Sequence, residues 1–576
     1  MKRWLKYALP YWQYFIIGPL CMIVEVVGEV VMPKLLSVII NMANNGTLTV
    51  AGSAQIMTAM IITAIVMMAG GVGGAYFGAK ASVNFAADLR ADCYNKVQKF
   101  AFANIDKFST GSLVTRLTND ITQIQNFVNM MLRMALRSPG MMIAALIMAI
   151  SIKPDLSVVF AISMPIMLFI IFFIISRAFP RFSAMQTKID NLNNTVQENV
   201  TNVRVVKSFV REEYETEKFA KANRDMKNTA TSAVKLMICM HPALTICMNL
   251  TTLAVVWFGG GIVLDGGMDI GDLSAFLTYV TQILSSLMMI TMLLMNSSRA
   301  MASGKRILEV LDEKLDLTDE GAAYPDLKVN DGKIEFDNVS FRYYKNSEDK
   351  VLDNINLTIE PGTTVGIIGS TGCGKTTLVS LISRLYDADC GKVLVDGVDV
   401  RDYSLKNLRD GVGVVLQKTT LFSGTVEENL RWGCEDATME EIISAAESAQ
   451  ADRFIRSFKD GYNTDIEQGG ANVSGGQKQR LCIARALLKK PKVIIFDDST
   501  SAVDTATEAA IRHTFATELA SSTKIIIAQR ISSVKDADMI VVMDDGRITG
   551  TGTHNELLET NKEYQEIYYS QTDKEV

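Results

Sequence analysis

Histidine is scarce in this chain of 576 residues, with three occurrences that lie far apart in the sequence. Because His241, His513 and His554 share no metal-ligand spacing, they predict no zinc site. The eight cysteines include no Cys-x-x-Cys pair, and several of them lie in apolar runs. A disulfide framework is therefore not expected, and a reducing compartment suits the soluble part of the chain.

A basic excess is also missing. Lysine and arginine together number 57, against 63 aspartates and glutamates, which gives a net charge of −6. Proteins that bind nucleic acid usually present a basic face, so this balance gives no reason to expect a nucleic-acid partner. Charged residues make up only 21% of the chain and hydrophobic residues 48%, with the long apolar runs confined to the first half.

Six apolar segments are long enough to cross a bilayer, which takes about 20 residues. They are Tyr14–Ile40, Ile56–Ala79, Met130–Ile150, Leu156–Ser176, Ala243–Leu264 and Leu273–Met295. The first apolar run continues too far for a signal peptide, so we expect a retained membrane helix. The first half is therefore predicted to be an α-helical domain in the cell membrane, with lipid as its neighbour.

The basic residues predict the orientation, because they gather on the cytoplasmic side of membrane proteins. Met1–Tyr14 carries three of them, whereas the connection Asn41–Gln55 has none. The connections Lys80–Asn129 and Arg177–Lys235 are long and rich in Lys and Arg. One topology satisfies every connection, with both termini and the second half of the chain in the cytoplasm.

The two basic connections are too long for loops, and their composition is helical. No proline occurs between Lys80 and Ser138. We therefore expect membrane helices that project into the cytosol and turn back near Asn104–Gly111 and Val203–Glu212.

From Lys333 onward, short β-branched segments alternate with helical ones. Examples are Thr364–Ile368, Val393–Val395, Val412–Leu416, Val493–Phe496, Lys524–Ala528 and Met539–Met543. This alternation predicts a mostly parallel sheet flanked by helices, an α/β fold. The expected domains are a transmembrane domain over residues 1–302, a charged linker over 303–332 and a nucleotide-binding domain over 333–576.

A phosphate-binding loop follows the expected strand Val365–Ile368. Its residues are Gly369, Ser370, Thr371, Gly372, Cys373, Gly374, Lys375, Thr376 and Thr377. They match the Walker A pattern, and a helix is expected directly afterwards, over Leu378–Leu385. The glycines let backbone N–H groups surround phosphates, Lys375 adds positive charge near the β- and γ-phosphates, and Thr376 offers a hydroxyl to Mg²⁺. ATP and Mg²⁺ are the expected cofactors.

A second element suits the same site. The apolar strand Val493–Phe496 ends in Asp497 and Asp498. Asp497 is placed to hold Mg²⁺ through water. Many strands end in aspartate, so this pattern gains its meaning from the phosphate loop that precedes it.

Between these elements lie Ser474, Gly475, Gly476 and Gln477, followed by an apolar helix through Leu488. This segment resembles the signature sequence of ATP-binding cassette (ABC) exporters. Nearly the whole chain resembles one half of such an exporter. In the expected order, Tyr343 resembles the aromatic residue that stacks on adenine, Gln417 the Q-loop glutamine at the catalytic and metal site, and Ser501–Asp504 the D-loop.

Two further segments, Asp106–Gly111 and Val205–Phe209, resemble the coupling segments of exporter membrane domains. The resemblance implies a head-to-tail pair of cassettes, with each ATP between one phosphate loop and the other chain's signature. A signature at a helix N-terminus suits a γ-phosphate. Closure around ATP would then be relayed through the coupling segments to switch the membrane cavity from inward-facing to outward-facing.

The chain departs from the family at the catalytic positions. Asp498 stands where the family has a glutamate base, and aspartate is one methylene shorter. Gln529 stands where the family has a switch histidine, and glutamine does not titrate near neutral pH. Gln468 is a milder departure from a glutamate that exporters often carry. Two changes in one site favour a specialised, slowly hydrolysing role.

The resulting hypothesis is the degenerate half of a heterodimeric exporter of a hydrophobic or amphipathic compound, with several drugs as one option. Its intact signature would complete a competent site on a second half-transporter. The alternatives are a homodimeric, slow exporter of lipid or peptide, and a regulatory membrane subunit that binds ATP.

Glu25 and Glu29 lie one turn apart in the first membrane segment and share a helix face. Two interpretations stay open: a site for cationic or proton-coupled substrates, or a structural pair that meets a base or hydroxyl on a neighbouring helix.

Overall fold

The computed structural model describes residues 2–344, 349–498, 505–517 and 519–572. The chain forms two compact units. The first contains residues 1–98 and 111–312, and the second contains residues 99–110 and 313–576.

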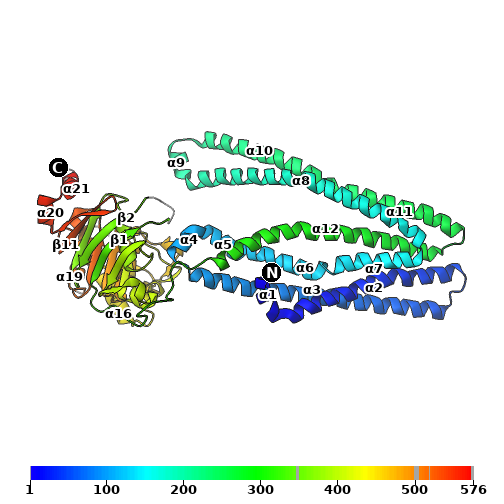
Figure 1. Ribbon diagram of the computed structural model, residues 1–576, viewed down its shortest axis with the longest axis horizontal. Helices are drawn as coiled ribbons and strands as arrows, with labels where there is room; N and C mark the ends of the chain where they lie inside the picture. The colour runs from blue at the N-terminus through cyan, green and yellow to red at the C-terminus, as the bar shows by residue number, and fades with distance from the viewer. Residues whose placement is uncertain (1, 345–348, 499–504, 518, 573–576) are drawn as a thin grey trace. The chain divides into compact units, whose positions relative to one another are not determined.

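The described part of the first unit is helical throughout (Figure 1). Its α-helices are α1 (Lys2–Ala8), α2 (Trp12–Asn44), α3 (Val50–Gln98), α5 (Thr110–Thr115), α6 (Ile121–Met134), α7 (Arg137–Ile152), α8 (Pro154–Thr201), α9 (Val203–Ser208), α10 (Glu212–Ile238), α11 (Met240–Leu264) and α12 (Ile270–Asp312). Six helical segments of the described chain are long and apolar enough to cross a membrane. This confirms the predicted membrane domain.

Large apolar side chains cover the outside of these helices. Leu264 is 89% exposed and Trp257 81%, and both lie on α11. A surface this apolar is unfavourable in water and matches the acyl chains of a bilayer. On the inner side, glycines allow α2 and α3 to approach closely: a Cβ on Gly70 would lie 2.8 Å from the carbonyl oxygen of Cys21.

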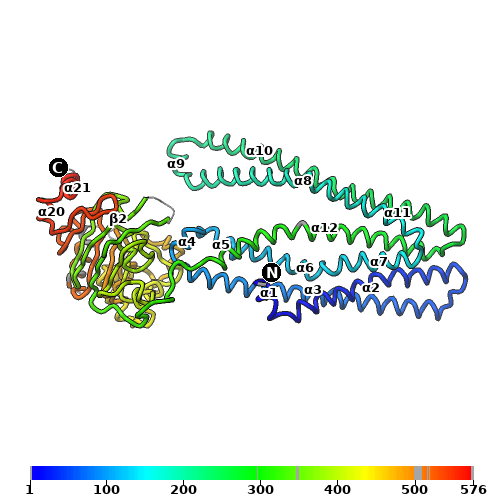
Figure 2. Tube along the Cα trace, viewed as in Figure 1, coloured from blue at the N-terminus to red at the C-terminus, as the bar shows by residue number. Residues whose placement is uncertain are grey.

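Helices α8 and α10 extend side by side and are joined by α9 (Figure 1). Figure 2 shows the chain reversing at α9, which lies within the predicted turn Val203–Glu212. The other predicted turn, Asn104–Gly111, overlaps α4 (Phe102–Phe108), a short helix that belongs to the second unit.

The second unit has three sheets in its described part. Its strands are β1 (Ile334–Phe341), β2 (Leu352–Ile359), β3 (Thr364–Gly369), β4 (Cys390–Val395), β5 (Val398–Asp399), β6 (Val412–Val415), β7 (Gly424–Thr425), β8 (Asp465–Ile466), β9 (Val493–Asp497), β10 (Thr523–Ile527), β11 (Met539–Asp544) and β12 (Arg547–Gly552). The largest sheet has the order β12-β11-β3-β10-β9-β6, and only the β11–β12 pair is antiparallel. The predicted mostly parallel sheet is confirmed.

The expected strand Val393–Val395 does not belong to this mostly parallel sheet. It is part of β4, in an antiparallel sheet of order β2-β1-β4-β5. The reason is local: Asp396 and Gly397 both have positive φ, 51° and 77°, and join β4 to β5 by a two-residue turn. Such a turn closes a hairpin and leaves no room for the crossover that parallel strands require.

Helices complete the second unit: α13 (Lys375–Ile382), α14 (Leu405–Gly411), α15 (Val426–Arg431), α16 (Met439–Ser448), α17 (Asp452–Ser457), α18 (Gly475–Leu488), α19 (Thr505–Thr517), α20 (His554–Thr560) and α21 (Lys562–Thr572). One apolar core lies around β1, β3 and α13, and a second lies around α16, α18 and β9. The parallel strands β3, β10, β9 and β6 end at one edge of the large sheet, so the residues that follow them meet there.

Candidate nucleotide site

The phosphate loop connects the buried strand β3 to α13. Gly374 caps the helix with a φ of 99°, and a Cβ at this position would lie 2.9 Å from the Val351 carbonyl oxygen. Only glycine accommodates this turn without strain. The Lys375 ammonium donates hydrogen bonds to the carbonyls of Gly369, at 2.9 Å, and Ser370, at 2.7 Å. The positive charge is therefore held directly over the loop.

Four other residues of the loop differ in their surroundings. Thr371 and Gly372 are exposed at the crest, where backbone groups can reach a ligand, while the Cys373 side chain is buried in the core below. The Ser370 hydroxyl donates to the Asp544 carboxylate at the end of β11, at 3.1 Å. Asp544 was not among the residues predicted from the sequence, although its place at the end of an apolar strand resembles that of Asp497.

Thr376 and Asp497, the two residues expected to hold Mg²⁺, are in contact. The Thr376 hydroxyl donates to Asp497 Oδ1 at 3.0 Å, and Asp497 is only 3% exposed. Burial raises the pKa of this carboxyl above its ordinary value, and the neighbouring Asp498 adds to the effect. A hydroxyl beside a buried carboxylate suits Mg²⁺, which prefers oxygen ligands and keeps several waters. The described residues contain no cluster of three or more His, Cys, Asp or Glu that could hold a metal by themselves.

The two departures from the family are in contact. The Gln529 side-chain amide donates a hydrogen bond to Asp498 Oδ2 at 2.8 Å. Their strands β10 and β9 are adjacent and parallel, with Ile527 paired to Asp497, so both residues follow their strands at the same edge. The Gln417 side chain also hydrogen-bonds to Asp498, from the segment that follows β6. The structure thus brings the three predicted catalytic residues together.

Asp498 has a constrained geometry. Its φ is +48°, and its N–H donates to the Ile527 carbonyl at 3.1 Å. Burial raises the pKa of its carboxyl, while the hydrogen bonds from Gln529 and Gln417 oppose that rise. The carboxylate is therefore oriented by two neutral donors and is not a free base.

Tyr343 lies beside the end of the phosphate loop. Its hydroxyl forms a 2.9 Å hydrogen bond with the Thr377 hydroxyl. Its ring meets Phe341 and Tyr386 edge to face, with centroid separations of 5.0 and 5.2 Å. Tyr386 was not among the residues predicted from the sequence, because its place just after α13 is its one distinguishing feature there.

The signature residues form the N-terminus of α18. Ser474 caps the helix: its hydroxyl accepts from the Gln477 N–H at 3.4 Å, and the Gln477 side chain accepts from the Ser474 N–H at 2.9 Å. Gly475 and Gly476 occupy the first turn; Gly475 is exposed and Gly476 is half-buried. The cap keeps the helix end ordered while its backbone N–H groups face outward. The D-loop segment Ser501–Asp504 lies outside the described residues.

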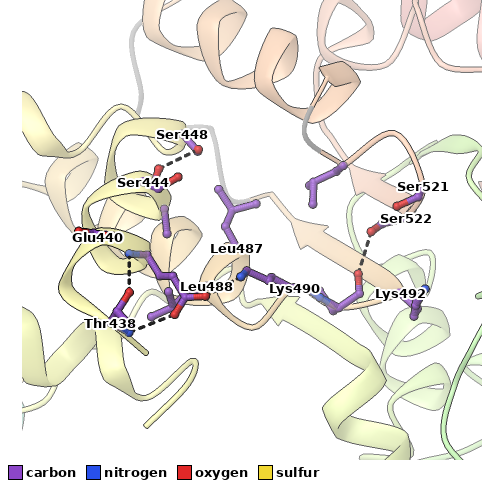
Figure 3. Close-up of a pocket in the computed structure, with 14 residues that line it drawn as sticks. Thr438, Glu440, Ser444, Ser448, Leu487, Leu488, Lys490, Lys492, Ser521 and Ser522 are labelled. Carbon is purple, nitrogen blue, oxygen red and sulfur yellow. Dashed lines mark hydrogen bonds and ion pairs between the residues drawn. The ribbon is translucent and has the colours of Figure 1, made fainter. Parts of the chain in front are cut away.

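A separate cavity of about 540 Å³ lies between α16, the end of α18 and residues 519–522 (Figure 3). Serines and leucines form half of its lining, and Lys490 is paired to Glu441 at 2.7 Å. None of the predicted site residues lines it.

In the membrane unit, Glu25 and Glu29 share one partner. Arg137 of α7 donates to Glu29 Oε1 at 2.8 Å and to Glu25 Oε1 at 3.3 Å. Gln282 of α12 donates to the Glu29 backbone carbonyl at 2.9 Å. Arg137 is the base on a neighbouring helix that the structural interpretation expects, so these contacts support that interpretation.

Replacement of Arg137 by Met is expected to destabilise the membrane unit by about 3 kcal/mol, because removal of one partner leaves buried charge uncompensated. The control is the triple variant with Glu25→Gln and Glu29→Gln added, which should regain most of the lost stability. Thermal unfolding in detergent micelles measures both. An Arg137→Met protein as stable as the wild type would show that the cluster does not support the helices.

Comparison with known proteins agrees with this arrangement. Residues 15–287 match the family described as ABC transporter transmembrane region, and residues 352–501 match the family described as ABC transporter. The uncharacterized ABC transporter ATP-binding protein YfiB of Bacillus subtilis (strain 168) is 36% identical over 582 residues, covering 100% of this chain and 99% of that protein.

Two further similarities extend the comparison. A fatty acid ABC transporter ATP-binding/permease protein of Mycobacterium tuberculosis (strain CDC 1551 / Oshkosh) is 35% identical over 484 residues, covering 84% of this chain and 75% of that protein. The structure of a bacterial Atm1-family ABC exporter with ATP bound has the same fold, with a TM-score of 0.80, 24% identity and coverage of 97% and 98%. The chain belongs to the ABC transporter family, with a membrane domain fused to an ATP-hydrolysing domain in one chain, and its fold is that of an ABC exporter.

Proposed function

We propose that this chain is the slowly hydrolysing half of a heterodimeric exporter. The observation that carries the proposal is the 2.8 Å hydrogen bond between Gln529 and Asp498 beside the phosphate loop. A general base needs a free oxygen within about 3 Å of the attacking water. Asp498 is shorter than the family's glutamate, and its carboxylate accepts amide hydrogen bonds from Gln529 and Gln417. Its own site therefore favours holding ATP over hydrolysing it.

The signature segment Ser474–Gln477, unlike the catalytic positions, keeps the residues expected of the family. Ser474 and Gln477 order the N-terminus of α18 and leave its first N–H groups available to an anion. In a head-to-tail pair this terminus faces the γ-phosphate of ATP bound to the second half-transporter. A partner that carries a glutamate base and a switch histidine would then hydrolyse ATP at that shared site.

At this chain's own site, Lys375, Thr376 and Asp497 bind the nucleotide and its metal. Thr376 and Asp497 hold Mg²⁺, with Gln417 as a further ligand, and the ion supplies charge neutralisation to the phosphates. Tyr343 stacks on adenine. The glycines from Gly369 to Gly374 expose the backbone N–H groups that surround the phosphates.

The basic residues before α2 and in the two long connections favour a topology with both termini and the ATP-binding unit in the cytoplasm. Cargo then moves from the cytosol outward, and a hydrophobic or amphipathic compound suits an apolar membrane unit. A lipid is a second candidate cargo, because the mycobacterial relative at 35% identity is named for fatty acids.

The proposal is tested by comparing the chain purified alone with the chain co-expressed with a second half-transporter encoded beside it. We expect stable co-purification and an ATP turnover far above that of the solitary chain. Glu and His at the partner's corresponding positions would agree with this result. Fast hydrolysis by the solitary chain, unaffected by Asp498→Ala, would contradict the heterodimer and favour a homodimer. A pair that binds ATP without transport would favour a regulatory subunit.

A further inference from the structure

Within the second unit, the short helix α4 contacts Tyr386. The Tyr386 hydroxyl donates a hydrogen bond to Asp106 Oδ2 at 3.1 Å, and the Phe102 ring lies 6.1 Å from the Tyr386 ring. Burial and the nearby Asp106 carboxylate raise the pKa of the Tyr386 phenol, which keeps it protonated and a donor. A hydrogen bond to an ionised acceptor is stronger than a neutral one.

Helix α4 also binds the segment of the same chain that follows α12, from Glu313 to Asp316. The Asn104 side chain donates to the Lys314 carbonyl at 2.9 Å and accepts from the Asp316 N–H at 3.2 Å. Lys107 pairs with Glu313 at 2.7 Å. Because α12 ends at Asp312, these bonds hold together two segments that are joined directly to the first unit, residues 99–110 and residues 313–316. A displacement of α4 is therefore passed to α3, α5 and α12 through covalent connections.

On its other side, Tyr386 contacts the adenine-stacking candidate. The Tyr343 and Tyr386 rings are nearly perpendicular, with an interplanar angle of 86° and centroids 5.2 Å apart, and Phe341 contacts both rings. The Tyr343 hydroxyl is bonded to Thr377, the last residue of the phosphate loop. Edge-to-face contacts depend on ring orientation, so a base that fixes the plane of Tyr343 also constrains Tyr386.

We propose that Tyr386 and Asp106 transmit nucleotide occupancy from Tyr343 to the segment that leads into the membrane helices. The order of contacts is the Thr377 hydroxyl, the Tyr343 ring, the Tyr386 ring and the Asp106 carboxylate on α4. Tyr386 is a positioning residue in this scheme and touches no substrate. The inference rests on the proposed stacking of adenine on Tyr343.

The test uses Tyr386→Phe in the complete transporter, reconstituted with its partner. This change keeps the ring and removes only the bond to Asp106. A fluorescent ATP analogue, TNP-ATP, measures nucleotide affinity, and spin labels on the α8–α10 hairpins measure the ATP-driven change of the membrane helices. We expect unchanged affinity and a shift of about fivefold or more in the conformational equilibrium at saturating ATP, the size of a modest coupling energy. Asp106→Ala should behave alike, and Asp106→Asn, which keeps an acceptor oxygen, should retain most of the response.

Tyr462→Phe is the matched control. The Tyr462 hydroxyl also donates a hydrogen bond to a carboxylate, Asp452 Oδ1, at 2.7 Å. Asp452 lies on α17 and not on α4. A full ATP response in Tyr386→Phe, or an equal loss in Tyr462→Phe, would overturn the relay. So would a loss of ATP affinity in Tyr386→Phe, because the tyrosine would then act within the binding site. Tyr343→Ala reports separately on the stacking role: unchanged affinity in that variant would contradict the role of Tyr343 itself.

Discussion

Replacing Asp498 with Glu and Gln529 with His together is expected to raise ATP turnover at this chain's own site by about 100-fold, the lower range of a general base's contribution. The longer carboxylate gains one methylene of reach toward the attacking water. The change at 529 also removes the amide that donates to Asp498 Oδ2 at 2.8 Å. The phosphate loop and the Thr376–Asp497 contact are left intact, so nucleotide binding should hardly change.

The measurement is steady-state phosphate release with hydrolysis at the second site disabled. Each single substitution is expected to give less than the double variant, because Asp498 and Gln529 contact one another and their effects are coupled. Asp497→Glu is the matched control: it lengthens the adjacent carboxylate by the same methylene but should lower turnover by disturbing the metal site. A double variant no faster than the wild type would mean that something other than these two residues limits hydrolysis.

The sequence was sufficient for the fold class and the phosphate loop because both depend on local patterns. Apolar runs of membrane length predict α2, α3, α7, α8, α11 and α12. The glycine spacing of the loop and the strand before it likewise appear within a few residues. The strand Val393–Val395 was misplaced because sheet membership depends on the Asp396–Gly397 turn as well as on apolar character.

The contacts between residues far apart in the chain could not be predicted from the sequence. Gln529 and Asp498 are 31 residues apart, and their bond follows only once β9 and β10 are known to be parallel neighbours. Arg137 was not identified as the partner of Glu25 and Glu29, because helix pairing in a membrane is set by packing that no local pattern encodes. Tyr386 lacks any motif, and its importance comes from contacting both Tyr343 and Asp106.

The intact signature leads to the second large prediction. Gly475→Asp should lower ATP hydrolysis by the assembled pair about 100-fold or more, the cost of losing a donor that stabilises transition-state charge. Gly475 is the first residue of α18, where an aspartate is compatible with the helix and its dipole. The new carboxylate would instead repel a γ-phosphate approaching the helix end. Folding should therefore be preserved while hydrolysis at the partner's site is lost.

Helix α16 offers the control within the same unit. Met439 is its first residue, and Thr438 and Glu441 form the same capping box that Ser474 and Gln477 form on α18. Met439→Asp places an identical charge at an equivalent helix position and should leave hydrolysis unchanged. Asp498→Ala should likewise change the rate of the pair by only about threefold. A general base that contributes little to hydrolysis lowers the rate only slightly when it is removed. If Asp498→Ala and Gly475→Asp were equally damaging, both sites would hydrolyse ATP, and the division of labour between the two chains would be wrong.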